Sequence, residues 1–284
     1  MGTGAAMRWR VWQGVVLAAL LLVVAGLAVQ AWANREGRQA LDDALDGLPA
    51  EWSADYEEAS VNLWTRRLHV FGLTVGHEDQ PPLRVDELVV VDLDRAHSPP
   101  RHMRLRAIGL HGKPAEGWPV PAAAWSDDSA EWAFAYRYDP EARSLQVEEF
   151  RLTVPGRGWA VGRLHLTRFD LEETLTTHAL SLPEFEVAGL TLRYRDQGFF
   201  RRLADEGRTE PMIPLVQGWA ARFDEPFFLE TAEAVSLFLR DPVALELQAQ
   251  PTEPVPLLDL VAMAMVSPEA IPARLEARVR ALRE

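Results

Sequence analysis

The sequence predicts an α+β protein with an N-terminal transmembrane helix, a curved antiparallel β-sheet domain and a largely helical C-terminal region packed on that sheet. Three observations predict this fold class. A long apolar run lies near the N-terminus, short alternating runs separated by turn formers follow it, and helical periodicity returns after Tyr194. The expected divisions are a membrane anchor or signal (1–34), a juxtamembrane helix (35–50), a β-rich domain (51–195) and a mainly helical subdomain (196–284).

The apolar run from Val11 to Ala33 is predicted to be a membrane-spanning helix. At about 1.5 Å of rise per residue, a helix of this length crosses a hydrocarbon core of roughly 30 Å. Arg8 and Arg10 precede the run, and no acidic residue occurs before Glu36. This asymmetry favours a cytoplasmic N-terminus, with the bulk of the chain on the far side of the membrane.

The same run has a second interpretation as a cleavable signal. Ala31-Trp32-Ala33 resembles the small-x-small end of a signal peptide. A retained anchor is favoured because the run is longer than a usual signal core. Tryptophans also lie near both of its ends, where aromatic rings prefer the headgroup layer. Whether the segment is cleaved stays open at this point.

Composition restricts the compartment and the classes of partner. The chain has no cysteine, so disulfides, thiolate metal sites and thiol nucleophiles are excluded. Its formal net charge of −13 argues against nucleic-acid binding, which requires a cationic surface. Lys113 is the only lysine beside many arginines, a bias typical of GC-rich bacterial genomes. We therefore expect a single-pass protein of the bacterial inner membrane, with its bulk in the periplasm.

A polar helix over Arg35–Leu48, terminated by Pro49, should come first after the apolar run, followed by strands that share one pattern. Two apolar residues alternate, two positions are skipped, and the alternation resumes. Because a strand has a period of two, a bulge or glycine kink must restore the apolar face. We expect these irregularities near Phe71-Gly72, Glu148-Glu149 and Ala188-Gly189. The strands with this pattern are Leu68–Val75, Leu83–Val90, Met103–Leu110, Leu145–Leu152, Trp159–Leu166 and Phe185–Leu192.

Helices dominate the predicted C-terminal subdomain. Asp196 is expected to cap a first helix that ends before Gly207, and a third helix should stop before Asp241-Pro242. The remaining expected elements are a helix around Leu215–Phe223, a short strand over Val243–Leu247, an apolar helix over Pro256–Met265 and a last helix from Ser267 that carries Ile271, Leu275 and Val279 on one face.

The search for catalytic chemistry returns no recognised motif, so we predict no enzyme activity, no cofactor and no metal. His69, His77, Glu78 and Asp79 could approach one another as metal ligands, but a solvated strand end explains them better. Asp92 lies two residues before Asp94, as paired carboxylates would, and a polar sheet face explains this pair equally well.

Two sets of residues are candidates for binding. The first set could line an apolar groove and would equally suit a closed core: Val70, Leu73, Val75, Leu88, Val90, Leu105, Ile108, Leu152, Leu190 and Leu192. The second set is a charge cluster that either docks the first C-terminal helix or contacts a partner: Arg195, Asp196, Arg201 and Arg202.

The N-terminal span, the polar helix and the strands Leu68–Val75 and Leu83–Val90 together resemble the start of AsmA-like bacterial envelope proteins. The resemblance covers roughly residues 8–110 and depends on pattern. The segment Leu190–Leu203 is similar to stretches in envelope proteins of the same general build. The resemblance implies an inner-membrane anchor and a sheet with an apolar concave face, in a group linked to lipid handling and outer-membrane assembly. This chain is short and its C-terminus is predicted to be helical, which departs from the large members.

Two functional hypotheses follow. The first is a non-catalytic module that binds a lipid or another amphiphile on a curved sheet. The second is a structural, assembly or secretion-accessory subunit that binds an envelope protein partner. A continuous open apolar surface would favour the first, and a closed core with an exposed strand edge or polar patch would favour the second.

Overall fold

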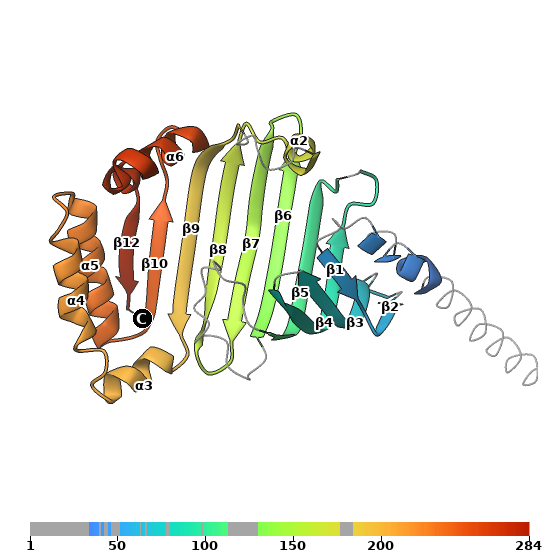
Figure 1. Cartoon of the computed structure of the whole chain (residues 1–284), viewed down its shortest axis with the longest axis horizontal. Helices are drawn as coiled ribbons and strands as arrows, with labels where there is room; N and C mark the ends of the chain where they lie inside the picture. The colour runs from blue at the N-terminus through green and yellow to red at the C-terminus, as the bar shows by residue number, and fades with distance from the viewer. Residues whose placement is uncertain are drawn as a thin grey trace, which may run out of the picture.

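The computed structural model describes residues 34–39, 41–42, 45–46, 52–62, 64–65, 67–77, 80–97, 99–112, 130–176 and 184–283. Its centre is one open antiparallel sheet of 12 strands (Figure 1). The strand order is β1-β3-β4-β5-β6-β7-β8-β9-β10-β12, while β2 pairs with β3 and β11 pairs with β9. The strands are β1 (Trp52–Asp55), β2 (Glu58–Asn62), β3 (Arg67–His77), β4 (Gln80–Leu93), β5 (His102–His111), β6 (Ala130–Asp139), β7 (Ser144–Val154), β8 (Gly158–Thr167), β9 (Glu186–Asp196), β10 (Ala244–Ala249), β11 (Val255–Pro256) and β12 (Arg278–Leu282).

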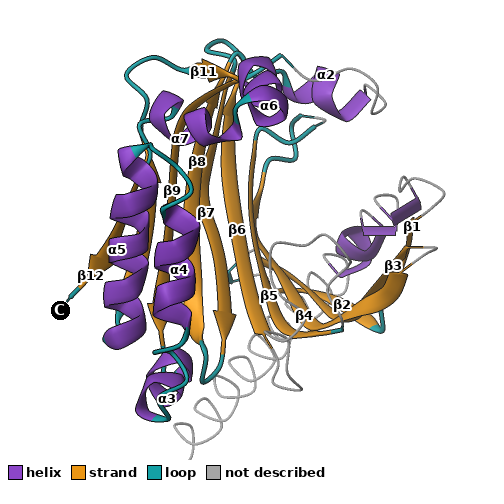
Figure 2. Cartoon of the chain, turned by 60° about the vertical axis from the view of Figure 1, so that its left-hand side comes forward, coloured by secondary structure: helices purple, strands orange, loops and turns teal. Residues whose placement is uncertain are grey.

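Helices lie at the two ends of the sheet and along one rim. α4 and α5 lie beside the C-terminal strands, and α2 and α6 lie at one end of the strands (Figures 1 and 2). Helical residues between 34 and 46 pack at the N-terminal end, where Arg38 Nε donates to the Ala59 carbonyl at 3.0 Å. The helices after β8 are α2 (Leu171–Thr176), α3 (Phe199–Asp205), α4 (Met212–Ala220), α5 (Pro226–Arg240), α6 (Leu257–Val266), the 3-10 turn η2 (Pro268–Ala270) and α7 (Ile271–Arg274).

The predicted fold class is wrong about the C-terminal region, which is not a largely helical unit packed on a sheet that ends at residue 195. β10, β11 and β12 continue the same antiparallel sheet beyond β9. The clearest error is the last predicted helix. Helical structure ends at Arg274, Glu276 adopts a left-handed φ of 49°, and residues from Arg278 onward form an edge strand on β10. The sequence Arg-Val-Arg-Ala-Leu alternates with the period of a strand, and this local period prevails over the wider helical spacing that includes Val279.

The predicted transmembrane helix, signal-anchor and single-pass inner-membrane location also require correction. The run Val11–Ala33 lies outside the described residues. Within the residues that the structure does describe, no helix combines the length and the apolar character needed to cross a membrane. The longest of these helices, α5, has 15 residues, whereas a span needs about 20.

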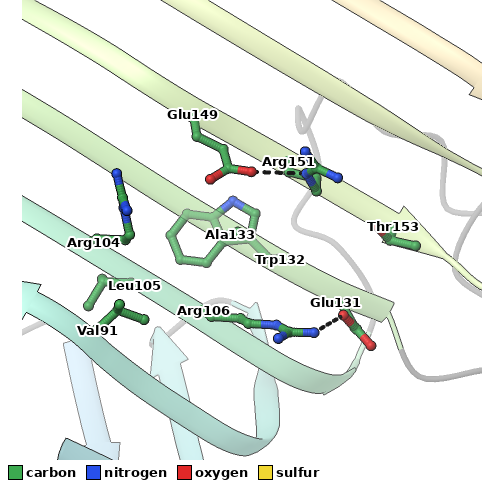
Figure 3. Close-up of a pocket in the computed structure, with 10 residues that line it drawn as sticks. All are labelled: Val91, Arg104, Leu105, Arg106, Glu131, Trp132, Ala133, Glu149, Arg151 and Thr153. Atoms are coloured by element: carbon green, nitrogen blue, oxygen red, sulfur yellow. Dashed lines mark hydrogen bonds and ion pairs between the residues drawn. The ribbon is translucent and has the colours of Figure 1, made fainter. Parts of the chain in front are cut away.

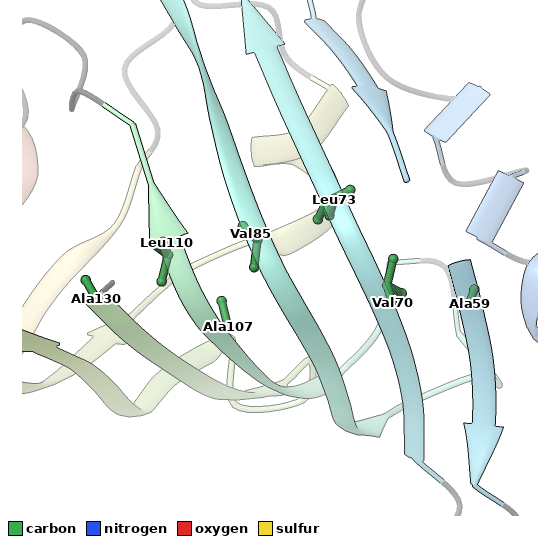
Figure 4. Packing of buried hydrophobic residues seen from close by; sticks show 7 residues of the cluster. All are labelled: Ala59, Val70, Leu73, Val85, Ala107, Leu110 and Ala130. Atoms are coloured by element: carbon green, nitrogen blue, oxygen red, sulfur yellow. The ribbon is translucent and has the colours of Figure 1, made fainter. Parts of the chain in front are cut away.

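Strands β1–β5, which we call the N-terminal limb, bend around a closed core (Figure 4). Gly72 on β3 and Gly109 on β5 both have left-handed φ values, of 63° and 69°. Both glycines lie opposite Asp86 of β4. Its neighbours on β4, Val85 and Glu87, pair with the residues on either side of Gly72 and of Gly109. The left-handed glycine kinks each strand and reverses its alternation. Residues three positions apart, such as Val70 and Leu73, therefore face the same core. The buried members of this core are Ala59, Val70, Leu73, Val85, Ala107, Leu110 and Ala130.

The bulge positions predicted from the apolar pattern have mixed outcomes. The register of β7 shifts on both of its sides around Glu148-Glu149, which confirms that position. The register between β8 and β9 shifts beside Ala188-Gly189, which confirms a second. At Phe71-Gly72 the register with β4 does not shift, and the left-handed Gly72 turns the apolar face instead.

Strands β6–β12 and their helices form the C-terminal limb, which has its own smaller cores. α5 contributes Phe238 and Leu239, and α4 contributes Ile213, to a cluster against Tyr194 of β9 and Leu245 of β10. The prediction for α5 is confirmed, since it ends at Arg240 and its expected inner face carries three buried residues, Phe228, Ala232 and Leu239. These contacts hold α4 and α5 on the face of the sheet that also carries the residues discussed next.

Candidate functional site

One face of the sheet carries a continuous row of apolar positions that crosses seven strands, from β5 at the end of the N-terminal limb through the C-terminal limb to β12. Register pairs join each position to the next, so the row runs perpendicular to the strands. Neighbouring strands lie about 4.8 Å apart, and the row is therefore roughly 29 Å long. We call this surface the apolar floor. Its positions in order are Leu105, Phe134, Phe150, Gly162, Leu192, Leu247 and Val279.

The middle of the apolar floor is open. Phe150 is 39% exposed and Leu192 is 40% exposed, although both stand among apolar neighbours. Gly162 lies between them, and a Cβ atom there would lie 3.6 Å from Leu192 Cδ1 and 3.8 Å from Phe150 Cδ1. The two side chains thus lean over the glycine and make one apolar surface. Large apolar side chains exposed side by side are typical of binding surfaces.

Helices stand on the same face around this open centre. At one end α4 and α5 cover Tyr194 and Leu245, which lie one row away from the apolar floor. At the rim α2 contributes Leu171 to a cluster with Phe169 and Leu166. At the other end Leu41 packs on the N-terminal core. The apolar floor is therefore bounded by packed elements, and an elongated apolar molecule could lie along it.

The residues predicted to line a groove separate into three groups. The sheet kink encloses Val70 and Leu73, and Val75, Leu88 and Leu152 pack against them in the N-terminal core. Val90, Leu105, Leu190 and Leu192 lie on the same face but outside that core, by register. Ile108 pairs with Glu87 and Glu131 and so lies on the opposite face.

The charge cluster at the end of β9 builds the connection to α3. Asp196 accepts hydrogen bonds from the backbone N–H groups of Gly198 (2.8 Å) and Phe200 (2.9 Å). Arg202 Nη2 donates to the Gly156 carbonyl at 3.1 Å, which ties α3 to the β7–β8 turn. The Arg201 backbone N–H also donates to Asp196, at 3.3 Å, and its side chain is exposed. The fourth residue of the cluster, Arg195, is exposed on the face opposite the apolar floor.

Tyr194 links this cluster to the core. Its hydroxyl lies 3.0 Å from the Arg157 carbonyl oxygen and 3.1 Å from a carboxylate oxygen of Asp196. Burial, followed by the neighbouring Asp196 carboxylate, raises the pKa of the Tyr194 hydroxyl above its ordinary value of 10.0. The neutral, hydrogen-bonded phenol is therefore the form that the fold requires.

The opposite face of the sheet is polar and contains a hollow of about 330 Å³ between β5, β6 and β7 (Figure 3). The hollow exists because the small side chain of Ala133 does not fill it, and arginines from β5 and β7 surround it. Each arginine is paired with a glutamate: Arg104 with Glu148 (3.4 Å), Arg106 with Glu131 (2.9 Å) and Arg151 with Glu149 (2.9 Å). Positive and negative charges therefore balance around the hollow, which makes it a weak attractor for a charged ligand.

The residues considered as metal ligands do not come together in the described structure. His69 Nδ1 pairs with Glu87 at 2.7 Å, while Glu78 and Asp79 lie outside the described residues. Within the described part of the chain, no group of three or more His, Asp or Glu side chains could hold a metal ion. Asp94 instead closes the β4–β5 loop: hydrogen bonds from the backbone N–H groups of Arg101 and Ala96, with a smaller contribution from His97, lower its pKa to about 2.

Sequence reasoning missed most of the apolar floor. Phe134 and Leu247 lie in alternating runs, but their alignment with Leu192 depends on the register of strands far apart in the sequence. The polar face was missed for a different reason. Arg193 and Arg195 flank Tyr194, and Arg278 and Arg280 flank Val279, so each pair marks one face of a strand. Only the observed pairing of β9, β10 and β12 brings the two pairs together.

A family model described as "Uncharacterized protein" matches residues 163–282, from the middle of β8 to the end of β12. No curated protein matches the chain. No solved structure matches it either. The matched segment contains Leu190–Leu203 but does not overlap residues 8–110, which carry the resemblance to AsmA-like proteins. The description of the family model names no envelope protein, so that resemblance stays a prediction.

Proposed function

We propose that this protein is a non-catalytic binding module that holds a lipid or another amphiphile, with its acyl chain along the apolar floor. The observation that carries the proposal is the exposure of Phe150 and Leu192 in the middle of an apolar row. In the N-terminal limb the comparable residues are enclosed: Val70 is fully buried and Leu73 is 8% exposed.

The expected affinity is modest. A fully buried methylene gains about 0.8 kcal/mol, and a chain lying on an open face buries roughly half of its surface. Fourteen methylenes would then gain roughly 5–6 kcal/mol, which corresponds to a Kd on the order of 0.1 mM. An acyl chain needs no specific polar contact to reach this range.

A fluorescent acyl probe, 11-(dansylamino)undecanoic acid, tests the proposal by titration into the purified full chain. We expect saturable binding, weakened about tenfold or more by Leu192→Asp, because a charge on the apolar floor is poorly solvated under an acyl chain. Leu215→Asp is the matched control, since Leu215 is an exposed leucine on α4, away from the sheet face. Probe binding that is absent, or that both variants weaken equally, would contradict the proposal.

A second candidate function, docking of a protein partner, is favoured by an exposed stripe on α4. Met212, Leu215 and Trp219 recur at helical spacing and are 40%, 72% and 42% exposed. In affinity purification from cells that produce the protein, a partner bound there would be lost with Leu215→Asp and kept with Leu192→Asp. The two variants thus separate the two candidate functions.

A further inference from the structure

Four arginines form a charged surface on the polar face of the C-terminal limb. Each is exposed and directly follows or precedes a residue of the apolar floor, so strand alternation places it on the opposite face. We call this surface the arginine ladder. Its members are Arg163 on β8, Arg193 on β9, and Arg278 and Arg280 on β12.

Pairing of the strands brings these arginines into two adjacent rows. Arg193 faces Glu246 of β10, and Glu246 in turn faces Arg280. In the next row, Arg163 and Arg278 stand at the ends, with Thr191 and Gln248 between them. Neighbouring positions across the strands are about 5 Å apart, and positions two residues apart along a strand are about 6.8 Å apart.

The arginine ladder differs from the hollow on the same face in its charge balance. Around the hollow, Arg104, Arg106 and Arg151 each have a glutamate within ion-pair distance. Among the residues that the structure describes, no carboxylate lies within 4.0 Å of a guanidinium of the arginine ladder. Glu246 is the one acidic side chain inside its two rows, against four arginines. At the margins, Glu276 is close enough to Arg278 for their charges to interact. Arg163 lies opposite the Glu148-Glu149 bulge of β7, whose two carboxylates already pair with other arginines. The surface therefore has excess positive charge on a chain whose net charge is −13.

We propose that the arginine ladder docks an extended acidic segment of a protein partner. Side chains on one face of an extended segment recur about every 6.8 Å, the spacing of Arg278 and Arg280 along β12. Guanidinium groups bind carboxylates in a bidentate geometry. Glu246 lies between Arg193 and Arg280, so the surface alternates in sign across the strands. It suits carboxylates at separate positions better than a continuous layer of phosphates, which the negative net charge also opposes.

This inference does not rest on the proposed function, because the arginine ladder and the apolar floor lie on opposite faces of the sheet. All four arginines lie within residues 163–282, the segment that the family model matches.

A labelled ten-residue peptide of alternating Glu and Thr, titrated into the full chain at 50 mM salt, tests the proposal. We expect saturable binding that weakens as salt rises and that is at least about tenfold weaker for the Glu-to-Gln version of the peptide. The double variant Arg193→Gln/Arg280→Gln should weaken binding about 5- to 20-fold. Arg104→Gln/Arg106→Gln, which removes the same charge from the balanced part of the face, should change it less than about twofold.

Circular dichroism establishes that both double variants are folded before their affinities are compared. Absence of peptide binding would overturn the proposal. So would an equal loss in the two double variants, which indicates attraction by overall charge. Vesicles of phosphatidylcholine with phosphatidylglycerol serve as the competing probe. If the chain binds these vesicles through Arg193 and Arg280 but does not bind the peptide, the surface recognises lipid phosphates and the proposal is wrong.

Discussion

The two limbs of the sheet are built from strands with the same alternating pattern, yet they use their apolar faces differently. In the N-terminal limb, the left-handed Gly72 and Gly109 bend the strands around a core whose buried members are at most 8% exposed. In the C-terminal limb, the register shifts of β7, β8 and β9 turn the strands without closing them on themselves, and Phe150 and Leu192 stay about 40% exposed. The two left-handed glycines are thus the feature that gives the N-terminal limb an enclosed core, whereas the C-terminal limb keeps an open apolar surface.

The largest expected difference between the limbs comes from the same substitution in each. Leu73→Ala should lower the free energy of unfolding by about 2–4 kcal/mol, because it removes a buried side chain and leaves a cavity. Leu192→Ala should cost about 1 kcal/mol, since its side chain is already 40% exposed. Urea denaturation of the two variants measures both values. Equal losses would show that the apolar floor is as closed as the N-terminal core.

A second pair of variants tests the glycines. Gly72→Ala should destabilise by about 1–3 kcal/mol, because a left-handed φ strains any residue with a Cβ and the new atom would meet Glu57. Gly189→Ala should change the free energy of unfolding by no more than about 0.5 kcal/mol. Gly189 is not left-handed, and a Cβ there would lie 3.8 Å from the Ala249 carbonyl oxygen, an ordinary contact. Thermal unfolding distinguishes them. A Gly189 variant as unstable as the Gly72 variant would refute the role given to the kink.

The smallest expected effect concerns the anchor of α3 on β9. Tyr194→Phe should cost about 1 kcal/mol at pH 7 by removing the hydroxyl's hydrogen bond. The folded-state pKa of Tyr194 is raised, mainly by burial and then by Asp196. Its contribution is therefore complete below the unfolded pKa of about 10 and is lost as pH rises above it. Denaturation of both proteins at several pH values measures the difference between their free energies of unfolding. That difference should be about 1 kcal/mol at pH 7 and should shrink progressively as pH rises above 10. A constant difference would show that Tyr194 does not titrate with folding.

The sequence predicts the local elements better than their assembly. The skipped alternation at Glu148-Glu149 and Ala188-Gly189 correctly marks register shifts, since a strand must restore its apolar face. The inner face of α5 is likewise a local feature. Gly198, and not Asp196, is the N-cap residue of α3, although the Asp196 carboxylate does accept hydrogen bonds from backbone N–H groups at the start of that helix. The edge strand over Arg278–Leu282 was missed because five alternating residues compete with the helical spacing before them, and its pairing with β10 decides the outcome.

The candidate sites were less predictable because they depend on register between distant strands. Leu192 was selected correctly as an apolar sheet residue, but nothing local shows that it lies in line with Phe150 and Leu247. Ile108 was assigned to the wrong face because the left-handed Gly109 reverses the alternation of β5 between Ala107 and Leu110. A one-residue irregularity changes the exposed face of everything beyond it.

Photo-crosslinking tests most directly whether the apolar floor binds acyl chains. The purified full chain is incubated with a diazirine-bearing palmitic acid, irradiated and digested, and the labelled residues are mapped by mass spectrometry. We predict labels on Phe134, Phe150, Leu192 and Leu247, displaced by unlabelled palmitic acid. Labels confined to α4 or α6, or labelling that excess palmitic acid does not displace, would contradict the account.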